Sequence, residues 1–236
     1  MQGAGAISQA LRAVTSPSLV VVDAITDDNL LEIGKAAKGC KLITGGSGVA
    51  LGLPANFGLS GRKARWSGVQ GAGAILSGSC SAATRGQVAA YAKNHPSFEI
   101  RADQVMSNEV TALRVANWML DNIDTAPLAY SSADPAAVAA AQAKYGGDTV
   151  ATKIEAMFAS IAKLLMAGGV KRFVIAGGET SGAVVAGLGI KAMEIGPEIA
   201  AGVPAMRAHG LAIALKSGNF GDVDFFEAAL KTLDAS

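Results

Sequence analysis

Three short turns, rich in glycine and hydroxyl side chains, hold the residues of this chain that are best suited to chemistry. They occupy residues 77–81 (Ser-Gly-Ser-Cys-Ser), 177–181 (Gly-Gly-Glu-Thr-Ser) and 216–221 (Lys-Ser-Gly-Asn-Phe-Gly). Each follows an apolar run typical of a buried strand, and the first two lead into helical patterns. Glycine lets backbone N–H groups approach a ligand, and a helix N-terminus attracts negative charge. The turns therefore indicate a phosphate site, although residues 177–181 alone are also typical of a helix capped by Thr180.

The three turns are expected to converge, because the carboxyl ends of parallel strands lie at one edge of an open sheet. Together they would offer backbone N–H groups, hydroxyls, the ammonium of Lys216 and the amide of Asn219, which suits a polyphosphate. Phosphoryl transfer depends mainly on positioning and charge neutralisation, usually with Mg²⁺. Glu179 could hold that ion or its waters, or it could simply complement the positive end of a helix.

A layered α/β fold, with a mostly parallel sheet flanked by helices, is the fold class that the sequence predicts. Half of the residues are hydrophobic and 5% are aromatic, so small aliphatic side chains must build the core. Apolar runs alternate with helical patterns, which favours parallel strands joined by crossovers. Strands are expected at residues 18–23, 41–44, 72–76, 98–101, 128–130, 173–176, 191–195 and 211–216. Helices are expected at residues 6–13, 26–39, 135–145, 149–167 and 224–233, with a further long helix ending near Ile123.

A segment rich in glycine interrupts this alternation at residues 54–71. It contains the basic cluster Arg62, Lys63 and Arg65, which is typical of a solvated linker but could also grip an acidic substrate. We therefore expect one domain at residues 1–66 and a second at residues 67–236.

Charge and composition exclude several classes of function. The formal net charge of +1 gives no reason to expect a nucleic acid as a partner. No acidic residue lies between Glu32 and Glu99, where eight lysines and arginines would form either a positive surface or an ordinary solvated face. Two histidines and two widely spaced cysteines exclude a His-rich metal centre and fit free thiols in a reducing compartment. No leader or membrane span is evident, so a cytoplasmic location is expected.

Two common nucleotide signatures do not match this chain. The pair Lys216-Ser217 is preceded by Leu215, so no Walker-type phosphate loop is present. Residues 46–52 space their third glycine one residue too late for a dinucleotide fingerprint, and the acidic residue expected about 20 positions later is missing. Binding of NAD is therefore not expected.

The motifs resemble those of the four-carbon acid sugar kinases, a family that phosphorylates compounds such as 3-oxo-tetronates with ATP. The similarity rests on short segments that follow the family's order and cover nearly the whole chain. They are residues 22–24, 44–48, 77–81 with Thr84 and Gln87, 177–181, 195–199, 202–204 and 215–221.

The resemblance implies an ATP-binding domain at residues 67–236 and only the end of a sugar-binding domain at residues 1–66. The sugar acid would contact Asp23, Ser47 and Gly48, and Glu179 is the candidate link to Mg²⁺. The nucleotide contacts implied are Ser79, Ser81, Thr84, Gly177, Gly178, Glu179, Thr180, Ser181, Lys216, Gly218, Asn219 and Gly221.

One departure from the family concerns an Asp-Asp pair followed by Thr-Gly, which is absent here. Asp27-Asp28 is followed by Asn29-Leu30, so the catalytic base and most sugar contacts are expected to lie outside this chain. The chain could be a fragment, could join a separate polypeptide that carries the other half, or could have lost catalysis. We expect the nucleotide half of a sugar-acid kinase, which could form a homo-oligomer; the alternative is a non-catalytic, effector-like binding module.

Overall fold

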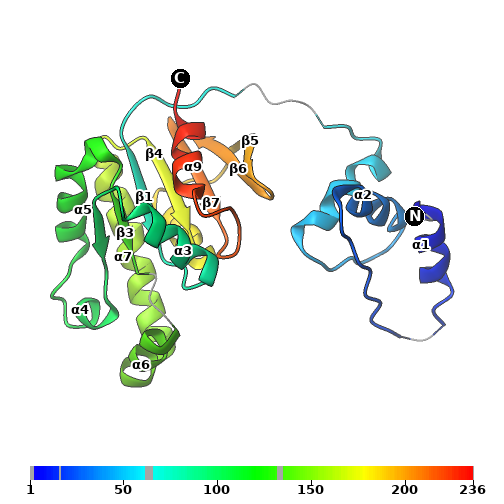
Figure 1. The fold of residues 1–236 in the computed structure, drawn as a ribbon, viewed down its shortest axis with the longest axis horizontal. Coiled ribbons are helices and arrows are strands. Elements are labelled where there is room, and N and C mark those ends of the chain that lie inside the picture. Colours follow the sequence, from blue (N-terminus) through cyan, green and yellow to red (C-terminus); the bar gives the residue numbers. More distant parts are fainter. Residues whose placement is uncertain (1–2, 16, 62–65, 132–134, 236) are drawn as a thin grey trace. The chain divides into compact units, whose positions relative to one another are not determined.

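The computed structural model describes residues 3–15, 17–61, 66–131 and 135–235. The chain forms two compact units, Met1–Lys63 and Ala64–Ser236, which are considered separately (Figure 1). The basic cluster expected in the linker, Arg62, Lys63 and Arg65, lies outside the described residues. Within the described ranges, no helix combines the length and the apolar character needed to cross a membrane.

The first unit is helical in its described part. It contains α1 (Gly3–Arg12), α2 (Asp27–Ala36) and the short 3-10 helices η1 (Ser47–Gly52) and η2 (Pro54–Phe57). A Cβ atom on Gly34 would lie 2.4 Å from the Cα of Gly52, so α2 and η1 pack backbone against backbone. Glycine is required at this contact because any side chain would separate the two elements.

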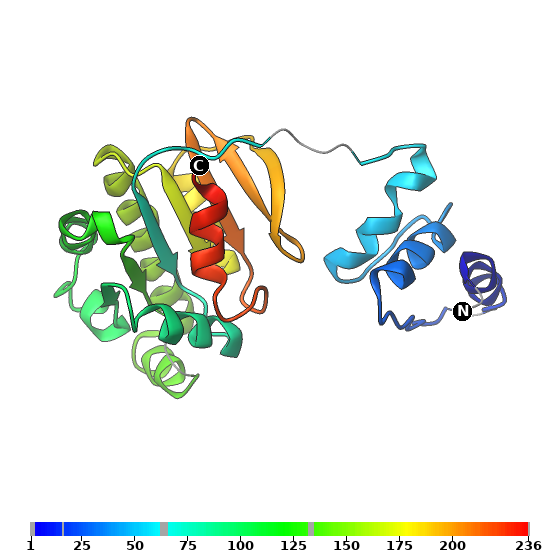
Figure 2. The ribbon, with the colours of Figure 1, turned by 45° about the horizontal axis from the view of Figure 1, so that its top comes forward.

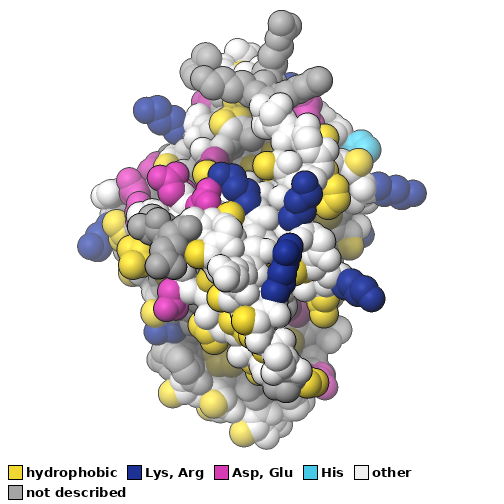
Figure 3. Space-filling model, turned by 90° about the vertical axis from the view of Figure 1, so that its right-hand side faces the viewer, with side chains coloured by type: hydrophobic (Ala, Val, Ile, Leu, Met, Phe, Trp, Pro, Cys, Tyr) yellow, Lys and Arg dark blue, Asp and Glu magenta, His cyan; other side chains and the backbone are white. Residues whose placement is uncertain are grey.

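The strands expected at residues 18–23 and 41–44 are not formed, so this prediction is wrong for the first unit. Neither segment forms a strand or joins the sheet of the described residues, and a strand requires a ladder of hydrogen bonds to a neighbour. Their apolar side chains face solvent instead: Leu19 is 98% exposed, and Val21 and Leu42 are each 87% exposed. Hydrophobic side chains are visible at the surface in Figure 3.

The second unit contains one sheet of seven strands in the order β2-β3-β1-β4-β7-β6-β5. The strands β2, β3, β1, β4 and β7 are parallel, whereas β6 and β5 each run antiparallel to the preceding neighbour. The predicted α/β class with a mostly parallel sheet is therefore confirmed. The strands are β1 (Gly73–Ser77), β2 (Ser97–Glu99), β3 (Leu128–Tyr130), β4 (Arg172–Ala176), β5 (Glu194–Ala200), β6 (Val203–Ala208) and β7 (Leu211–Lys216).

Strand β6 is not among the strands expected from the sequence, and it contains Pro204, a residue normally excluded from the interior of a sheet. Two-residue turns join β5, β6 and β7 into a meander, with Gly202 at φ +75° in the first turn and His209 at φ +51° in the second. Positive φ angles are typical of the tight turns that connect antiparallel strands. The pairs Ala201-Gly202 and His209-Gly210 were the signal for this hairpin geometry.

Helices of the second unit cover both faces of the sheet (Figure 2). The long helix expected to end near Ile123 is two helices, because Asn108 adopts φ +60° between α4 and α5. The helices are α3 (Ala82–Tyr91), α4 (Ala102–Met106), α5 (Ala112–Asp121), α6 (Pro135–Tyr145), α7 (Gly147–Ala167), α8 (Gly178–Gly187) and α9 (Phe225–Leu233), with the 3-10 helix η3 (Ile123–Thr125).

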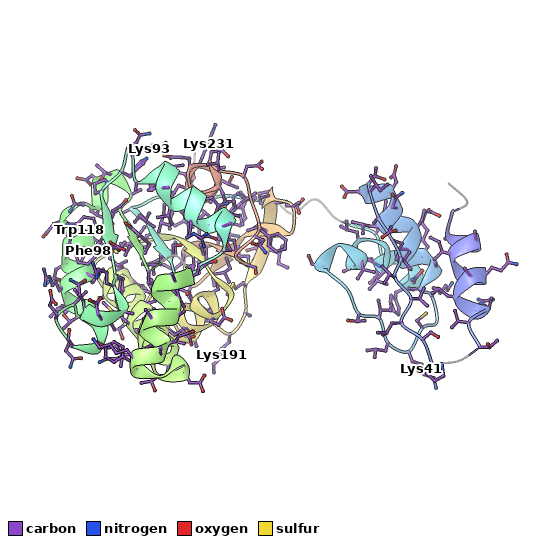
Figure 4. The ribbon with its side chains drawn as sticks, turned by 60° about the horizontal axis from the view of Figure 1, so that its bottom comes forward. Lys41, Lys93, Phe98, Trp118, Lys191 and Lys231 are labelled. Atoms are coloured by element: carbon purple, nitrogen blue, oxygen red, sulfur yellow. The ribbon has the colours of Figure 1, made fainter. Side chains whose placement is uncertain are left out.

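Alternate side chains of the central strands enter two separate cores, as the period of two in a strand requires. In β4, Phe173 and Ile175 pack with α5, α7 and α8, whereas Val174 and Ala176 pack with α3 and α9. Near the β2 edge, the rings of Phe98 and Trp118 lie 5.3 Å apart and extend the first core (Figure 4). The sheet is thus held from both sides, which fixes the positions of its strand ends.

Candidate functional site

The ends of three neighbouring strands lie in register and begin the three candidate turns. Ser77 of β1 pairs with Ala176 of β4, and Ala176 pairs with Lys216 of β7. The backbone N–H of Gly78 donates to the carbonyl of Ala176 at 2.8 Å, and that of Gly177 donates to the carbonyl of Lys216 at 2.9 Å. From β1 the chain first proceeds to β2 and β3 on one side and then to β4 on the other. The turns therefore lie at the reversal of strand order, where open α/β sheets commonly bind ligands.

Close packing between the turns requires glycine at their contact points. A Cβ atom on Gly78 would lie 2.1 Å from Thr180 Oγ1, and one on Gly218 would lie 2.7 Å from Ser79 Oγ. Gly177 has φ +121°, and a Cβ there would approach the Ser79 backbone nitrogen to 3.2 Å. The structure thus brings the three turns into direct contact.

Helix α8 begins at Gly178 without a side chain that caps its first turn. The capping role considered for Thr180 is therefore not observed; Thr180 lies inside the first turn and is buried. The first N–H groups of a helix have no carbonyl partner within the helix, and the helix dipole adds partial positive charge there. Gly178 and Glu179 are exposed at this end, whereas Ser181 is buried and its hydroxyl has no hydrogen-bond partner among the described residues.

The first turn of α3 binds the third turn of the site. Ser81 is the N-cap of α3 and accepts a hydrogen bond from the Thr84 backbone N–H. The Ser81 hydroxyl donates to the carbonyl of Gly218 at 2.5 Å, and the Thr84 hydroxyl lies 2.8 Å from the same oxygen. These residues therefore hold the turn at Gly218 instead of facing open solvent.

Lys216 lies beneath the same turn and is 1% exposed. Its Nζ donates to Thr84 Oγ1 at 2.8 Å and to the Gly218 carbonyl at 3.1 Å. Burial lowers the pKa of this ammonium to about 8, because charge is disfavoured away from water. No ion pair of Lys216 is found in the described part of the chain. Direct contact of Lys216 with the outer phosphates remains a prediction, since the side chain does not line the pocket described below.

Gln87, which was not among the predicted site residues, is also directed at this turn. Its Nε2 lies within hydrogen-bonding distance of three consecutive carbonyls, at 3.1 Å from Phe220, 2.9 Å from Gly221 and 2.9 Å from Asp222. The side chain is 1% exposed. Buried polar side chains gather around the three turns, as shown by Ser77, Thr84, Gln87, Thr180, Ser181 and Lys216.

A pocket of about 940 Å³ opens beside the first two turns and is bounded by α6, α7 and the segment between β2 and α4. Its apolar wall includes Val150 and Ile154 of α7, and its charged side chains are those of Glu99, Arg101, Asp103, Lys144, Glu155 and Glu179. The spacing of Val150, Ala151 and Ile154 on one helical face was the only sequence signal for this wall. From the predicted site, the lining residues are Ser79, Gly177, Gly178, Glu179, Thr180 and Gly218. Ser81, Thr84, Ser181, Lys216, Asn219 and Gly221 belong to the turns or their supports but do not line the pocket.

The pocket suits Mg²⁺ that is bound together with a polyphosphate. Such an ion is commonly coordinated by one or two carboxylates of the protein and by the phosphate oxygens. Glu179 is exposed at the pocket and could serve as such a carboxylate. Among the described residues, no group of three or more His, Cys, Asp or Glu side chains could hold a metal alone. Any Mg²⁺ here would therefore depend on the nucleotide.

The three predicted sugar-acid contacts lie in the first unit. Asp23 is exposed in the irregular segment before α2, and Ser47 is exposed at the start of η1. Gly48 packs against α2, because a Cβ atom there would lie 2.9 Å from Leu30 Cδ1. Their contact with a substrate remains a prediction.

Comparison with known proteins identifies relatives of this chain. The family described as nucleotide-binding C-terminal domain matches residues 74–226, which include all three turns. Over 242 residues the chain is 40% identical to a 3-oxo-tetronate kinase of Brucella melitensis, covering 98% of this chain and 56% of that protein. It is also 40% identical over 249 residues to a 3-oxo-tetronate kinase of Pectobacterium atrosepticum, covering 99% and 59%.

A crystal structure from Haemophilus influenzae has a similar fold, with a TM-score of 0.73 and 36% identity, covering 98% of this chain and 58% of that one. The chain thus spans somewhat more than half the length of the relatives that it matches. The resemblance predicted from the motifs is confirmed: the chain belongs to the nucleotide-binding C-terminal domain family and is similar to 3-oxo-tetronate kinases over nearly its whole length.

Proposed function

We propose that this chain carries the ATP-binding half of a kinase that phosphorylates a four-carbon acid sugar of the 3-oxo-tetronate class. The observation that carries the proposal is the register of Ser77, Ala176 and Lys216, which starts three glycine-rich turns side by side. Relatives named 3-oxo-tetronate kinase support the reaction class. A cytoplasmic location is part of the same proposal.

The geometry provides separate environments for the parts of ATP. The uncapped start of α8 would receive phosphate oxygens, because the unpaired N–H groups of its first turn and the helix dipole favour anions. The apolar wall at Val150 and Ile154 would cover the base. Two basic side chains, Arg101 and Lys144, line the same pocket beside four acidic ones, and Arg101 is paired with Asp103 at 3.3 Å. Mg²⁺, held by the phosphates with Glu179, would neutralise charge that develops during transfer.

Binding of the sugar acid that accepts the phosphoryl group would require residues other than those that line the pocket. Asp23, Ser47 and Gly48 remain the candidates for sugar contacts in the first unit. The exposed apolar segments at residues 18–23 and 41–44 would pair with strands of the part of the relatives that this chain does not match. We therefore expect phosphorylation to need that other half, whether it is covalently joined or separate.

Calorimetric titration with ATP and Mg²⁺ tests the nucleotide site. Saturable ATP binding is expected, and no detectable heat at millimolar nucleotide would refute the proposal. A kinase assay on four-carbon sugar acids, with the N-terminal part of a relative added or omitted, tests the reaction. ATP binding without phosphorylation under both conditions would favour the alternative of a non-catalytic binding module.

A further inference from the structure

We infer that Tyr145 is the residue on which the base of the nucleotide stacks, so that this side chain favours a nucleoside triphosphate over inorganic polyphosphate. The inference rests on the proposed ATP site and adds to it a contact for the base, which the three turns do not provide. Tyr145 is the last residue of α6, is half-buried and lines the pocket of about 940 Å³. Among the described residues that line this pocket, it is the one aromatic side chain.

Tyr145 is set apart from the other aromatic residues of the second unit by its packing. Every other one, from Trp66 to Phe226, belongs to one of the two cores or packs against it. Tyr145 belongs to neither core, and none of the described side chains of α6 is fully buried. Ligand pockets are commonly lined by aromatic side chains that contribute a large contact area. A ring that lines the pocket and that neither core uses is therefore suited to a ligand.

The corner between α6 and α7 holds the backbone of Tyr145 in place. The N–H of Gly146 donates to the carbonyl of Gln142 at 2.8 Å, which closes the last turn of α6. Gly146 then adopts φ +86°, an angle that glycine reaches without strain, and turns the chain into α7. Val150 lines the pocket just after this corner, and its N–H donates to the Gly146 carbonyl at 3.2 Å. The position of the ring is thus fixed in advance, which lowers the cost of ordering it around a ligand.

The place of Tyr145 relative to α7 suits the base and not the phosphates. The glycine turns lie near Phe158, because a Cβ atom on Gly78 would lie 3.3 Å from Phe158 Cε2. Phe158 comes about three helical turns after the start of α7, whereas Tyr145 precedes that start. Ile154 lies between these two levels of the helix and lines the pocket. A nucleotide with its phosphates at the turns would therefore extend its base along α7 toward Tyr145.

The two faces of the Tyr145 ring differ in their surroundings. The Nζ of Lys144 lies over one face, 4.6 Å from the ring centroid. No aromatic ring contacts Tyr145 within the described part of the chain. Aromatic side chains stack on any base, because every base has a π-face, and this contact does not read its hydrogen-bonding edge. Inorganic triphosphate has no such face and would gain nothing from Tyr145.

The test compares wild type, Tyr145→Leu and Tyr145→Phe by calorimetric titration with ATP, adenosine and inorganic triphosphate. Tyr145→Leu should weaken ATP and adenosine by about tenfold each and change triphosphate by less than about twofold. Tyr145→Phe keeps the ring and should bind all three ligands within about twofold of wild type. Phe57→Leu is the matched control, because Phe57 is 78% exposed in the first unit, and it should change none of the three affinities.

Unchanged binding of ATP and adenosine by Tyr145→Leu would overturn the inference. Equal weakening of all three ligands would also overturn it, because a distorted pocket and not a lost stacking contact would then explain the effect. A Tyr145→Phe variant that behaves like Tyr145→Leu would assign the contact to the hydroxyl group instead of the ring. If wild type itself fails to bind ATP, the proposed function fails first, so the two failures are distinguishable.

A second measurement uses the wild-type protein and does not depend on the folding of Tyr145→Leu. The chain contains three tyrosines, so labelled tyrosine rings give a simple NMR spectrum, in which Tyr145→Phe identifies the Tyr145 signals by their loss. Nuclear Overhauser contacts are expected between the Tyr145 ring and the adenine protons of bound ATP. Their absence in protein saturated with ATP would overturn the inference.

Discussion

Replacing Lys216 by methionine should remove a pH-dependent part of the stability of the second unit. Lys216 is 1% exposed, and burial lowers its pKa from 10.5 to about 8. At about 1.4 kcal/mol for each pH unit, this lowering corresponds to about 3 kcal/mol. Methionine has a similar length and no charge, so it fills the space without titrating.

The sign follows from proton binding. Between pH 8 and 10.5 the unfolded chain keeps the proton on Lys216 while the folded chain releases it. Stability therefore rises with pH across this window, and the penalty for burying the ammonium is fully present below pH 8. The difference in unfolding free energy between wild type and Lys216→Met should grow by about 3 kcal/mol, in favour of wild type, from pH 8 to 10.5.

Urea unfolding followed by tryptophan fluorescence measures this difference in the second unit, because Trp66 and Trp118 both lie there. Lys191→Met is the matched control, since Lys191 is exposed on the second unit (Figure 4). The control should follow wild type at every pH. A wild-type to Lys216→Met difference that stays constant between pH 8 and 10.5 would refute the assignment of a buried, charged amine to this position.

Four further substitutions test separate parts of the second unit. Gly78→Ala should cost about 1–3 kcal/mol in urea unfolding, because its Cβ would lie 2.1 Å from Thr180 Oγ1. Gly182→Ala in α8 is the control: its Cβ would meet open space, so this variant should be neutral or stabilising. Similar losses of unfolding free energy in both variants would contradict the close packing at Gly78. Tyr91→Phe removes a buried hydroxyl that donates to the Ala126 carbonyl at 2.7 Å. It should cost about 1 kcal/mol, and an unchanged melting temperature would count against that bond. Glu179→Gln should weaken ATP by roughly tenfold when Mg²⁺ is present and little when EDTA replaces it; equal effects in both buffers would exclude a metal role.

Local patterns in the sequence predict much of the fold, because they depend on near neighbours along the chain. The apolar run before Gly177 predicts β4, and the glycine pair after it predicts the start of α8. Strand β6 was missed because Pro204 is unusual inside a sheet, where a missing N–H normally excludes it. The N-terminal segment at residues 18–23 has strand composition but forms no strand, because strand propensity depends on the surrounding structure.

The candidate site was predictable in its turns but not in its hydrogen bonds. Convergence of the turns follows from the direction of parallel strands, whereas the register of Ser77, Ala176 and Lys216 is set by pairing between distant segments. In β7, Lys216 follows Ala212 and Ala214 at intervals of two residues, so its side chain leaves the strand on the same face of the sheet. That face packs against α3 and α9. That alternation was the available signal that its ammonium would lie beneath the turn. The role of Gln87 could not be read in advance, because its three carbonyl partners lie more than 130 residues away.

Hydrogen exchange with and without Mg·ATP measures directly whether the three turns on neighbouring strands form one ATP phosphate site. Bound nucleotide should slow exchange together in residues 78–84, 177–182 and 217–223, with little change in the first unit. Protection confined to one of these segments, or located elsewhere while ATP is bound, would contradict the account.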